Sequence, residues 1–204
     1  MEKVIKLNCP GCGAPVSTEH KTCAFCTRPI IISTITDIIS MPTPEVNKYA
    51  NAYRKELVAN PDNKNLNMSL AMCYFKLKMY DKASEAFEKA VEDNFEDADR
   101  FFYAAVNLLK GQKAFVTPRA NIDKAIEYLN AANMIEDKAI YHYFLAYIKK
   151  DYFDRKYLNI KPNWEDELNS AIELGLTNAE AYQLFELLGV EQPECLQSAE
   201  EDID

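Results

Sequence analysis

The sequence predicts a mostly α-helical protein that begins with a small cysteine-rich module. From Thr43 onward, segments of 12 to 17 residues carry apolar residues at i, i+3, i+4 and i+7 and alternate with short breakers such as residues 60–63, which indicates helix after helix. Ahead of these helices, two Cys-x-x-Cys pairs lie within residues 9–26. The chain has 204 residues, 48% of them hydrophobic, so it can bury a real core.

The two cysteine pairs predict a metal site. Thiolates stay available as ligands in a reducing cytosol, where disulfides are disfavoured, so paired Cys-x-x-Cys units point to a metal first. We expect a tetrahedral site in which each pair turns tightly to present two sulfurs at about 2.3 Å from one ion. Two disulfides or a rubredoxin-like iron site are the alternatives. The predicted ligands are Cys9, Cys12, Cys23 and Cys26.

The sequence around these cysteines resembles a known module. Cys-Pro-Gly-Cys-Gly-Ala-Pro, ten residues between the inner cysteines, and then Cys-Ala-Phe-Cys are similar to the short zinc ribbon of many bacterial and archaeal multidomain proteins. The resemblance covers roughly residues 5–32 and implies a small β module with structural Zn²⁺, closed by four ligands and without hydrolytic chemistry. Thr27 departs from the glycine that usually follows the fourth cysteine, at a cost of about 1 kcal/mol.

A short apolar stretch follows the module. Residues 30–39 read IIISTITDII, which is about half the length that a membrane-spanning helix needs and contains four polar residues. We expect a β-strand or a packed linker here. The sequence shows no signal-peptide pattern and no long apolar run, so we expect a cytoplasmic protein without a membrane partner.

The helical region contains a 34-residue pattern. Residues 64–97 resemble a tetratricopeptide repeat (TPR), in which small residues let two helices approach closely and aromatic residues fill the space between successive pairs. The residues that carry this resemblance are Leu70, Ala71, Tyr74, Tyr80, Ala83, Phe87 and Ala90.

Weaker copies of the pattern continue along the chain. A second unit pairs Ala104 and Ala105 with an Ala125, Leu129 and Ala132 motif, after a loop at about 111–117. A third unit is more degenerate, with an insertion around 151–163. We therefore expect a zinc ribbon over 1–32, a linker over 33–42, a TPR-like helical hairpin solenoid over 43–189 and an acidic disordered tail over 190–204. An irregular helical bundle is the alternative fold.

The TPR resemblance implies a partner-binding groove lined by the first helix of each repeat. In that register the groove side chains are mostly apolar and aromatic, which favours an amphipathic helix or an extended segment of another protein. The alternative is that the chain's own linker or loops cover this strip. The predicted groove residues are Met68, Met72, Phe75, Phe102, Val106, Leu109, Tyr143 and Tyr147.

Charge and motif content separate the possible functions. The net charge is −9, yet the first 30 residues carry +2, so only the head could contact nucleic acid. With two histidines and no phosphate-binding glycine loop, the sequence offers few parts for catalysis or for a small-molecule substrate. We expect a non-enzymatic protein-interaction scaffold, with a nucleic-acid-associated factor that uses the basic ribbon as the alternative.

Overall fold

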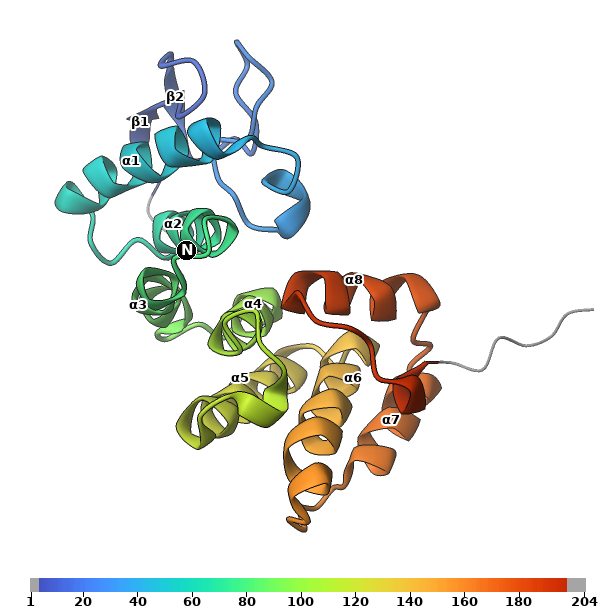
Figure 1. Cartoon of the computed structure of the whole chain (residues 1–204). Helices are drawn as coiled ribbons and strands as arrows, with labels where there is room; N and C mark the ends of the chain where they lie inside the picture. The colour runs from blue at the N-terminus through green and yellow to red at the C-terminus, as the bar shows by residue number, and fades with distance from the viewer. Residues whose placement is uncertain (1–3, 198–204) are drawn as a thin grey trace, which may run out of the picture. The chain divides into compact units, whose positions relative to one another are not determined.

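The computed structural model describes residues 4–197 and is mostly helical, as the sequence predicts. Over these residues it contains eight α-helices and one two-stranded sheet (Figure 1). The chain forms two compact units, Met1–Phe95 and Glu96–Asp204. The boundary between them lies inside the region where the sequence predicts one continuous repeat domain.

The cysteine-rich module is a small β structure. Strand β1 (Lys6–Asn8) pairs antiparallel with β2 (Pro15–Ser17), with Leu7 opposite Val16. A second, isolated bridge joins Thr22 to Pro29. The interior of the module is small and consists of two cysteines and a few aliphatic side chains: Leu7, Cys9, Cys23 and Ile30.

The apolar stretch after the module is a packed linker, and only one turn of it, Ile35–Asp37, is a 3₁₀ helix. Four of its isoleucines are almost fully buried because they pack inside the first unit, whereas Ile31 is partly buried and Ile39 is 56% exposed. The backbone N–H of Ile32 donates a 2.9 Å hydrogen bond to Ser69 Oγ, and Lys76 Nζ donates to the carbonyl of Ile39 at 2.8 Å. The buried linker residues are Ile30, Ile32, Ile35 and Ile38.

Three helices complete the first unit: α1 (Thr43–Ala59), α2 (Lys64–Lys76) and α3 (Tyr80–Val91). Helix α2 packs against both α1 and α3. The small residues of the predicted repeat lie at these contacts and are fully buried, because Ala71, Ala83 and Ala90 leave the helices room to approach. Helix α1 begins at Thr43, and Pro42 is its N-cap.

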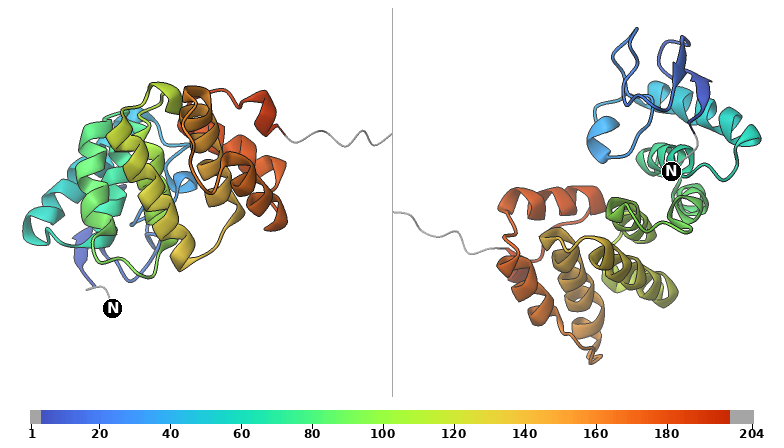
Figure 2. Two further views of the ribbon diagram at one scale, coloured as in Figure 1. Left: turned by 90° about the horizontal axis from the view of Figure 1, so that it is seen from below. Right: turned by 180° about the vertical axis from the view of Figure 1, so that it is seen from behind.

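The second unit contains α4 (Ala98–Leu108), α5 (Arg119–Ile135), α6 (Ala139–Ile148), α7 (Trp164–Glu173) and α8 (Asn178–Leu188). The pairs α4–α5 and α6–α7 make its most extensive contacts, and α8 lies against α6 and α4 (Figure 2). Ala125, Leu129 and Ala132, which the repeat pattern singled out, are completely buried.

The predicted insertions contain short helices. Residues 111–117 include a 3₁₀ turn at Ala114–Val116. After α6 the chain continues as a π-helix, Lys149–Phe153, and a 3₁₀ turn, Asp154–Lys156. Helix α8 is capped at both ends, since Thr177 and Glu180 form a capping box and Gly189 ends the helix at a φ of 66°.

The end of the described chain differs from the expected disordered tail. Residues 190–197 pack on the second unit, where the side chain of Leu196 is only 3% exposed. The hydroxyl of Tyr143 donates a 2.6 Å hydrogen bond to the carbonyl of Leu196. Leu196 is the apolar anchor of this segment, and the acidic composition of its neighbours gave no indication that it would be buried. Residues 198–204 of the predicted tail lie outside the described residues.

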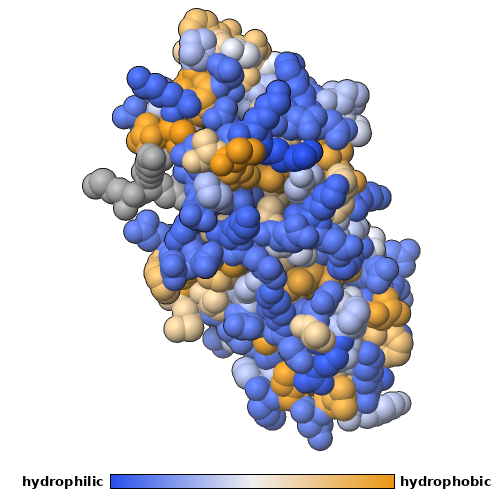
Figure 3. Space-filling view, turned by 90° about the vertical axis from the view of Figure 1, so that its left-hand side faces the viewer, coloured by the Kyte–Doolittle hydropathy of each residue, from blue (hydrophilic) through white to orange (hydrophobic). Residues whose placement is uncertain are grey.

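One face of the described residues is mostly polar. Figure 3 shows hydrophilic side chains over most of the face that it presents, with hydrophobic ones in separate small groups. Across residues 4–197, none of the helices has the combination of length and apolar character that crossing a bilayer requires.

Candidate metal centre and partner-binding surface

The four predicted ligands lie together at one end of the N-terminal module. The sulfur atoms of Cys9, Cys12, Cys23 and Cys26 all fall within 4.8 Å of one another. The Sγ atoms of Cys9 and Cys26 are 3.7 Å apart, and those of Cys12 and Cys23 are 3.8 Å apart. Four sulfurs at about 2.3 Å from one ion in tetrahedral geometry are separated by about 3.8 Å, so the cluster fits a four-thiolate metal site.

Two equivalent turns position the sulfurs. In the first turn, the N–H of Gly13 donates to the carbonyl of Cys9 at 2.9 Å; in the second, the N–H of Thr27 donates to that of Cys23 at 2.8 Å. Gly13 and Thr27 both have positive φ, 81° and 59°. The expected departure at Thr27 is therefore a β-branched residue held in the left-handed region that glycine prefers.

The electrostatics of the cluster favour a bound cation. Burial disfavours the thiolate of Cys23, but the backbone amides of Phe25 and Cys26 lower the pKa of Cys23 to about 7. A hydrogen bond from the backbone N–H of Arg28 lowers the pKa of Cys26, yet burial and the three neighbouring thiols raise it to about 12. One sulfur ionises easily and its neighbour resists ionisation, because adjacent thiolates repel each other. A divalent cation removes that repulsion.

The same geometry bears on the disulfide alternative. A disulfide requires an S–S distance of about 2.05 Å, whereas the closest sulfurs here are 3.7 Å apart and all four cysteines are free thiols. His20, near the second pair, is exposed and does not belong to the cluster. An iron ion would use the same four sulfurs, so the ligand geometry accepts both metals.

The two cysteine turns are fixed to helix α1. Lys48 Nζ donates a hydrogen bond to the carbonyl of Gly11 in the first turn. Beside the second turn, the hydroxyl of Tyr49 donates to the carbonyl of Pro29 at 3.1 Å, and Arg28 forms a 2.5 Å ion pair with Glu45. The module therefore packs on the helical part of the first unit.

Gly11 shows how close this packing is. A Cβ atom on Gly11 would lie 3.0 Å from Cδ of Arg28, 3.2 Å from the hydroxyl of Tyr49 and 3.4 Å from Sγ of Cys26. A side chain at this position would push these neighbouring side chains back by a few tenths of an ångström, so glycine suits the tight contact between the first turn, α1 and the second turn.

The predicted groove residues do not line an open groove. Seven of the eight have side chains that are at most 6% exposed, and Phe75 is half-buried. They pack inside their own units, so the prediction of an accessible strip is corrected. The seven buried residues are Met68, Met72, Phe102, Val106, Leu109, Tyr143 and Tyr147.

In each unit, segments of the chain itself cover this face. In the first unit, the linker lies against α2 through the contact of Ile32 with Ser69, on the same side of the helix as Met72. In the second unit, Phe185 of α8 packs on Tyr143 and Tyr147, with ring centroids 6.1 and 5.1 Å away. The linker cover is the alternative that the sequence left open, whereas the cover by α8 lies outside the 34-residue pattern and was not predicted.

Sequence reasoning missed a buried ionic cluster in the second unit. Glu167 is 5% exposed, and one of its carboxylate oxygens accepts a hydrogen bond from the equally buried Lys149 at 2.5 Å. His142 lies 2.6 Å from the second oxygen of Glu167 and 2.9 Å from Asp137. The insertion before α7 left the repeat register of this helix uncertain, so the sequence did not predict that Glu167 faces inward.

Comparison with known proteins does not extend these assignments. No protein-family model matches the sequence, and no curated protein matches it significantly. The resemblances to a zinc ribbon and to TPR hairpins therefore depend on the residues quoted above and on the geometry of the two units.

Proposed function

We propose that this protein is a non-enzymatic, cytoplasmic scaffold that binds other proteins through TPR-like helical hairpins. The observation that carries the proposal is the way in which consecutive helices pair. Helices α2–α3, α4–α5 and α6–α7 make the most extensive contacts in their units, and small residues of the predicted repeat are buried between them. Hairpins of this type cannot bury their apolar faces alone and typically present surfaces to protein partners.

In this proposal the four cysteines hold structural Zn²⁺. Four protein ligands leave no open coordination position, so the metal contributes folding free energy and no Lewis-acid chemistry. Because Lys48 and Tyr49 join the turns to α1, the ion also fixes the module on the helices. The exposed tip of the module, where Phe25 is 72% exposed, provides a second contact surface.

The contacts of the basic head favour protein over nucleic acid as the partner. Arg28 forms an ion pair with Glu45, and the ammonium group of Lys48 donates a hydrogen bond to the carbonyl of Gly11. Lys6 and Lys21 remain exposed on the described part of the module. Two dispersed cations are fewer than a phosphate-tracking surface uses.

Affinity purification from the native cells tests this function. The tagged full-length chain should retain at least one protein in stoichiometric amount after nuclease treatment, and the reconstituted pair should elute as one complex with the summed mass. The scaffold proposal would be contradicted if the untreated chain purified with nucleic acid and nuclease treatment then removed all of its protein partners. Metal analysis of the same sample should find about one zinc per chain, and an equal amount of iron instead would overturn the choice of metal.

A further inference from the structure

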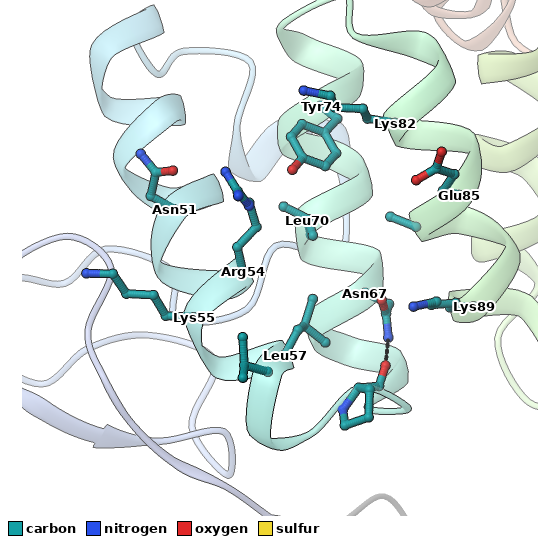
Figure 4. Close-up of a pocket in the computed structure, with 13 residues that line it drawn as sticks. Asn51, Arg54, Lys55, Leu57, Asn67, Leu70, Tyr74, Lys82, Glu85 and Lys89 are labelled. Atoms are coloured by element: carbon teal, nitrogen blue, oxygen red, sulfur yellow. Dashed lines mark hydrogen bonds between the residues drawn. The ribbon is translucent and has the colours of Figure 1, made fainter.

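An open groove lies between α1 and α3, with α2 as its floor. It has a volume of about 820 Å³ and belongs entirely to the first unit (Figure 4). Each helix contributes residues at helical spacing. The lining residues used below are Arg54 and Leu57 from α1, Leu70 and Tyr74 from α2, and Lys82 and Lys89 from α3.

This groove lies on the opposite side of α2 from the strip that the sequence predicted. Asn67, Leu70 and Tyr74 follow one stripe of the helix, spaced three and four residues apart. Ser69 and Lys76, which bond to the linker, project roughly half a turn away. The linker therefore covers one face of α2 and leaves the other open between α1 and α3.

The walls of the groove are cationic. In Figure 4, Arg54 stands on the α1 side, and Lys82 and Lys89 point from α3 toward the space above α2, whereas Lys55 points away. Glu85 is the one acidic residue that lines the groove. Within the described part of the chain, Arg54 and Lys89 have no ion-pair partner, so their charges are available to a ligand.

The floor offers an apolar surface with one hydroxyl. In the apolar part Leu57 is half-buried, Leu70 is 7% exposed, and Val58 is 86% exposed at the rim. Lys82 Nζ lies 5.9 Å from the centroid of the Tyr74 ring, which holds the ammonium group at the top of the groove. Across residues 4–197, no group of the chain accepts a hydrogen bond from the Tyr74 hydroxyl.

We infer that this groove binds an acidic amphipathic segment of a partner protein. The inference deepens the proposed scaffold function by naming the surface and the chemistry of the partner. Apolar side chains of the segment lie on Leu57 and Leu70, and its carboxylates face Arg54 on one wall and Lys89 on the other. Such pairing of apolar anchors with complementary charge is how helix-binding grooves gain both affinity and specificity.

Other anionic ligands fit the groove less well. A small anion held by exposed side chains gains little, because water screens each contact and the long side chains lose entropy. A nucleic-acid strand needs a continuous basic track and aromatic platforms, whereas Glu85 interrupts the α3 wall and Lys82 covers Tyr74.

A direct binding assay with the full-length, metal-loaded chain tests the inference. The probe is a fluorescein-labelled amphipathic peptide of about 14 residues, with leucines at i, i+3 and i+7, four glutamates beside them and alanine elsewhere. A matched probe carries glutamine at each glutamate. In about 50 mM salt, fluorescence anisotropy should show binding of the glutamate probe that weakens as salt is added, and little binding of the glutamine probe.

Charge-matched variants locate the site. Arg54→Glu combined with Lys89→Glu should weaken the glutamate probe by at least about tenfold. Lys21→Glu combined with Lys78→Glu alters the net charge equally at exposed positions outside the groove and should change affinity by less than about twofold. Equal loss in both pairs, no binding by the wild-type chain, or displacement of the probe by an equimolar uridine oligonucleotide would overturn the inference.

Co-purification separates this inference from the scaffold proposal. If the Arg54→Glu, Lys89→Glu variant folds and retains every stoichiometric partner of the wild type, the groove assignment is wrong and the scaffold function stands. If these partners are lost by this variant and kept by the Lys21→Glu, Lys78→Glu variant, the groove is the binding surface.

Discussion

The two units cover their apolar helical faces with different segments and different interactions. In both, a segment outside the repeat pattern covers the face of the helices that the pattern would leave open. The first unit carries 12 basic and 11 acidic residues, and its helical face is covered by the aliphatic linker that follows the cysteine-rich module. The second carries 11 basic and 21 acidic residues and closes with α8 and the segment around Leu196.

The comparison bears on where the proposed scaffold would bind a partner. The apolar residues that the repeat register singles out stabilise each unit internally, because the chain supplies its own cover. Binding surfaces must then come from what the covers leave exposed. In the first unit that is a groove with cationic walls on a nearly neutral unit, while the strong acidity of the chain is confined to the second.

Loss of the metal should produce the largest difference between the units. Cys12→Ser removes an exposed ligand, so it should abolish metal binding with little direct damage to packing. Structural zinc contributes on the order of 10 kcal/mol in small zinc domains, so the first unit should lose several kcal/mol of stability. Hydrogen exchange should become faster around Tyr49 and Tyr53 of α1 and stay unchanged in α6.

The matched control is Cys195→Ser, which replaces an exposed thiol in the second unit. It should leave both metal content and exchange unchanged. Equal exchange in the Cys12→Ser and wild-type proteins would show that the module and α1 are not coupled.

The buried ionic cluster should dominate the stability of the second unit. Glu167→Ala leaves the buried ammonium group of Lys149 without its carboxylate, which should cost about 3–5 kcal/mol. Urea unfolding of the second unit measures this loss. Glu165→Ala, in the same helical turn but exposed, should change the unfolding free energy by less than about 0.5 kcal/mol. Similar values for the two variants would contradict the buried pair.

The linker should stabilise the first unit through its buried side chains only. Ile38 is completely buried and its neighbour Ile39 is 56% exposed. Ile38→Ala should therefore cost about 2–4 kcal/mol, whereas Ile39→Ala should cost well under 1 kcal/mol. If both variants unfold at the same denaturant concentration, the linker is not packed as described.

The two metal-binding turns allow the smallest and most specific test. Thr27→Gly relieves a positive φ and should stabilise the metal-loaded first unit by about 0.5–1 kcal/mol. Gly13→Ala, at the equivalent position, should destabilise it by about 1 kcal/mol although no atom obstructs the new methyl group. Thermal unfolding that shifts in the same direction for both variants would contradict the equivalence of the turns.

Local chemistry predicted much of this structure. The spacing of the cysteines was sufficient to predict the sulfur cluster, because each Cys-x-x-Cys turn is formed by residues adjacent in sequence. Helix ends such as the Thr177–Glu180 capping box were predictable for the same reason. The burial of Ala71 and Ala125 followed from their helical spacing.

Long-range contacts could not be predicted in the same way. Whether Met72 faces a partner or the chain's own linker depends on where residues 30–39 run, and their apolar pattern is compatible with a strand as well as a linker. Leu196 occurs in an acidic, aperiodic segment, so nothing in its neighbours signals that it packs against the second unit. The groove beside Leu70 arises from three helices at once and has no linear motif.

Hydrogen exchange of the protein with and without a co-purified partner distinguishes the open groove from the covered helical faces. The partner should protect residues 51–58 of α1 and 82–89 of α3, while residues 30–39 and 190–197 keep the exchange rates of the free chain. Faster exchange in residues 30–39 or 190–197 upon binding, without protection of α1 and α3, would show that the partner displaces the covering segments and enters the face that we describe as closed.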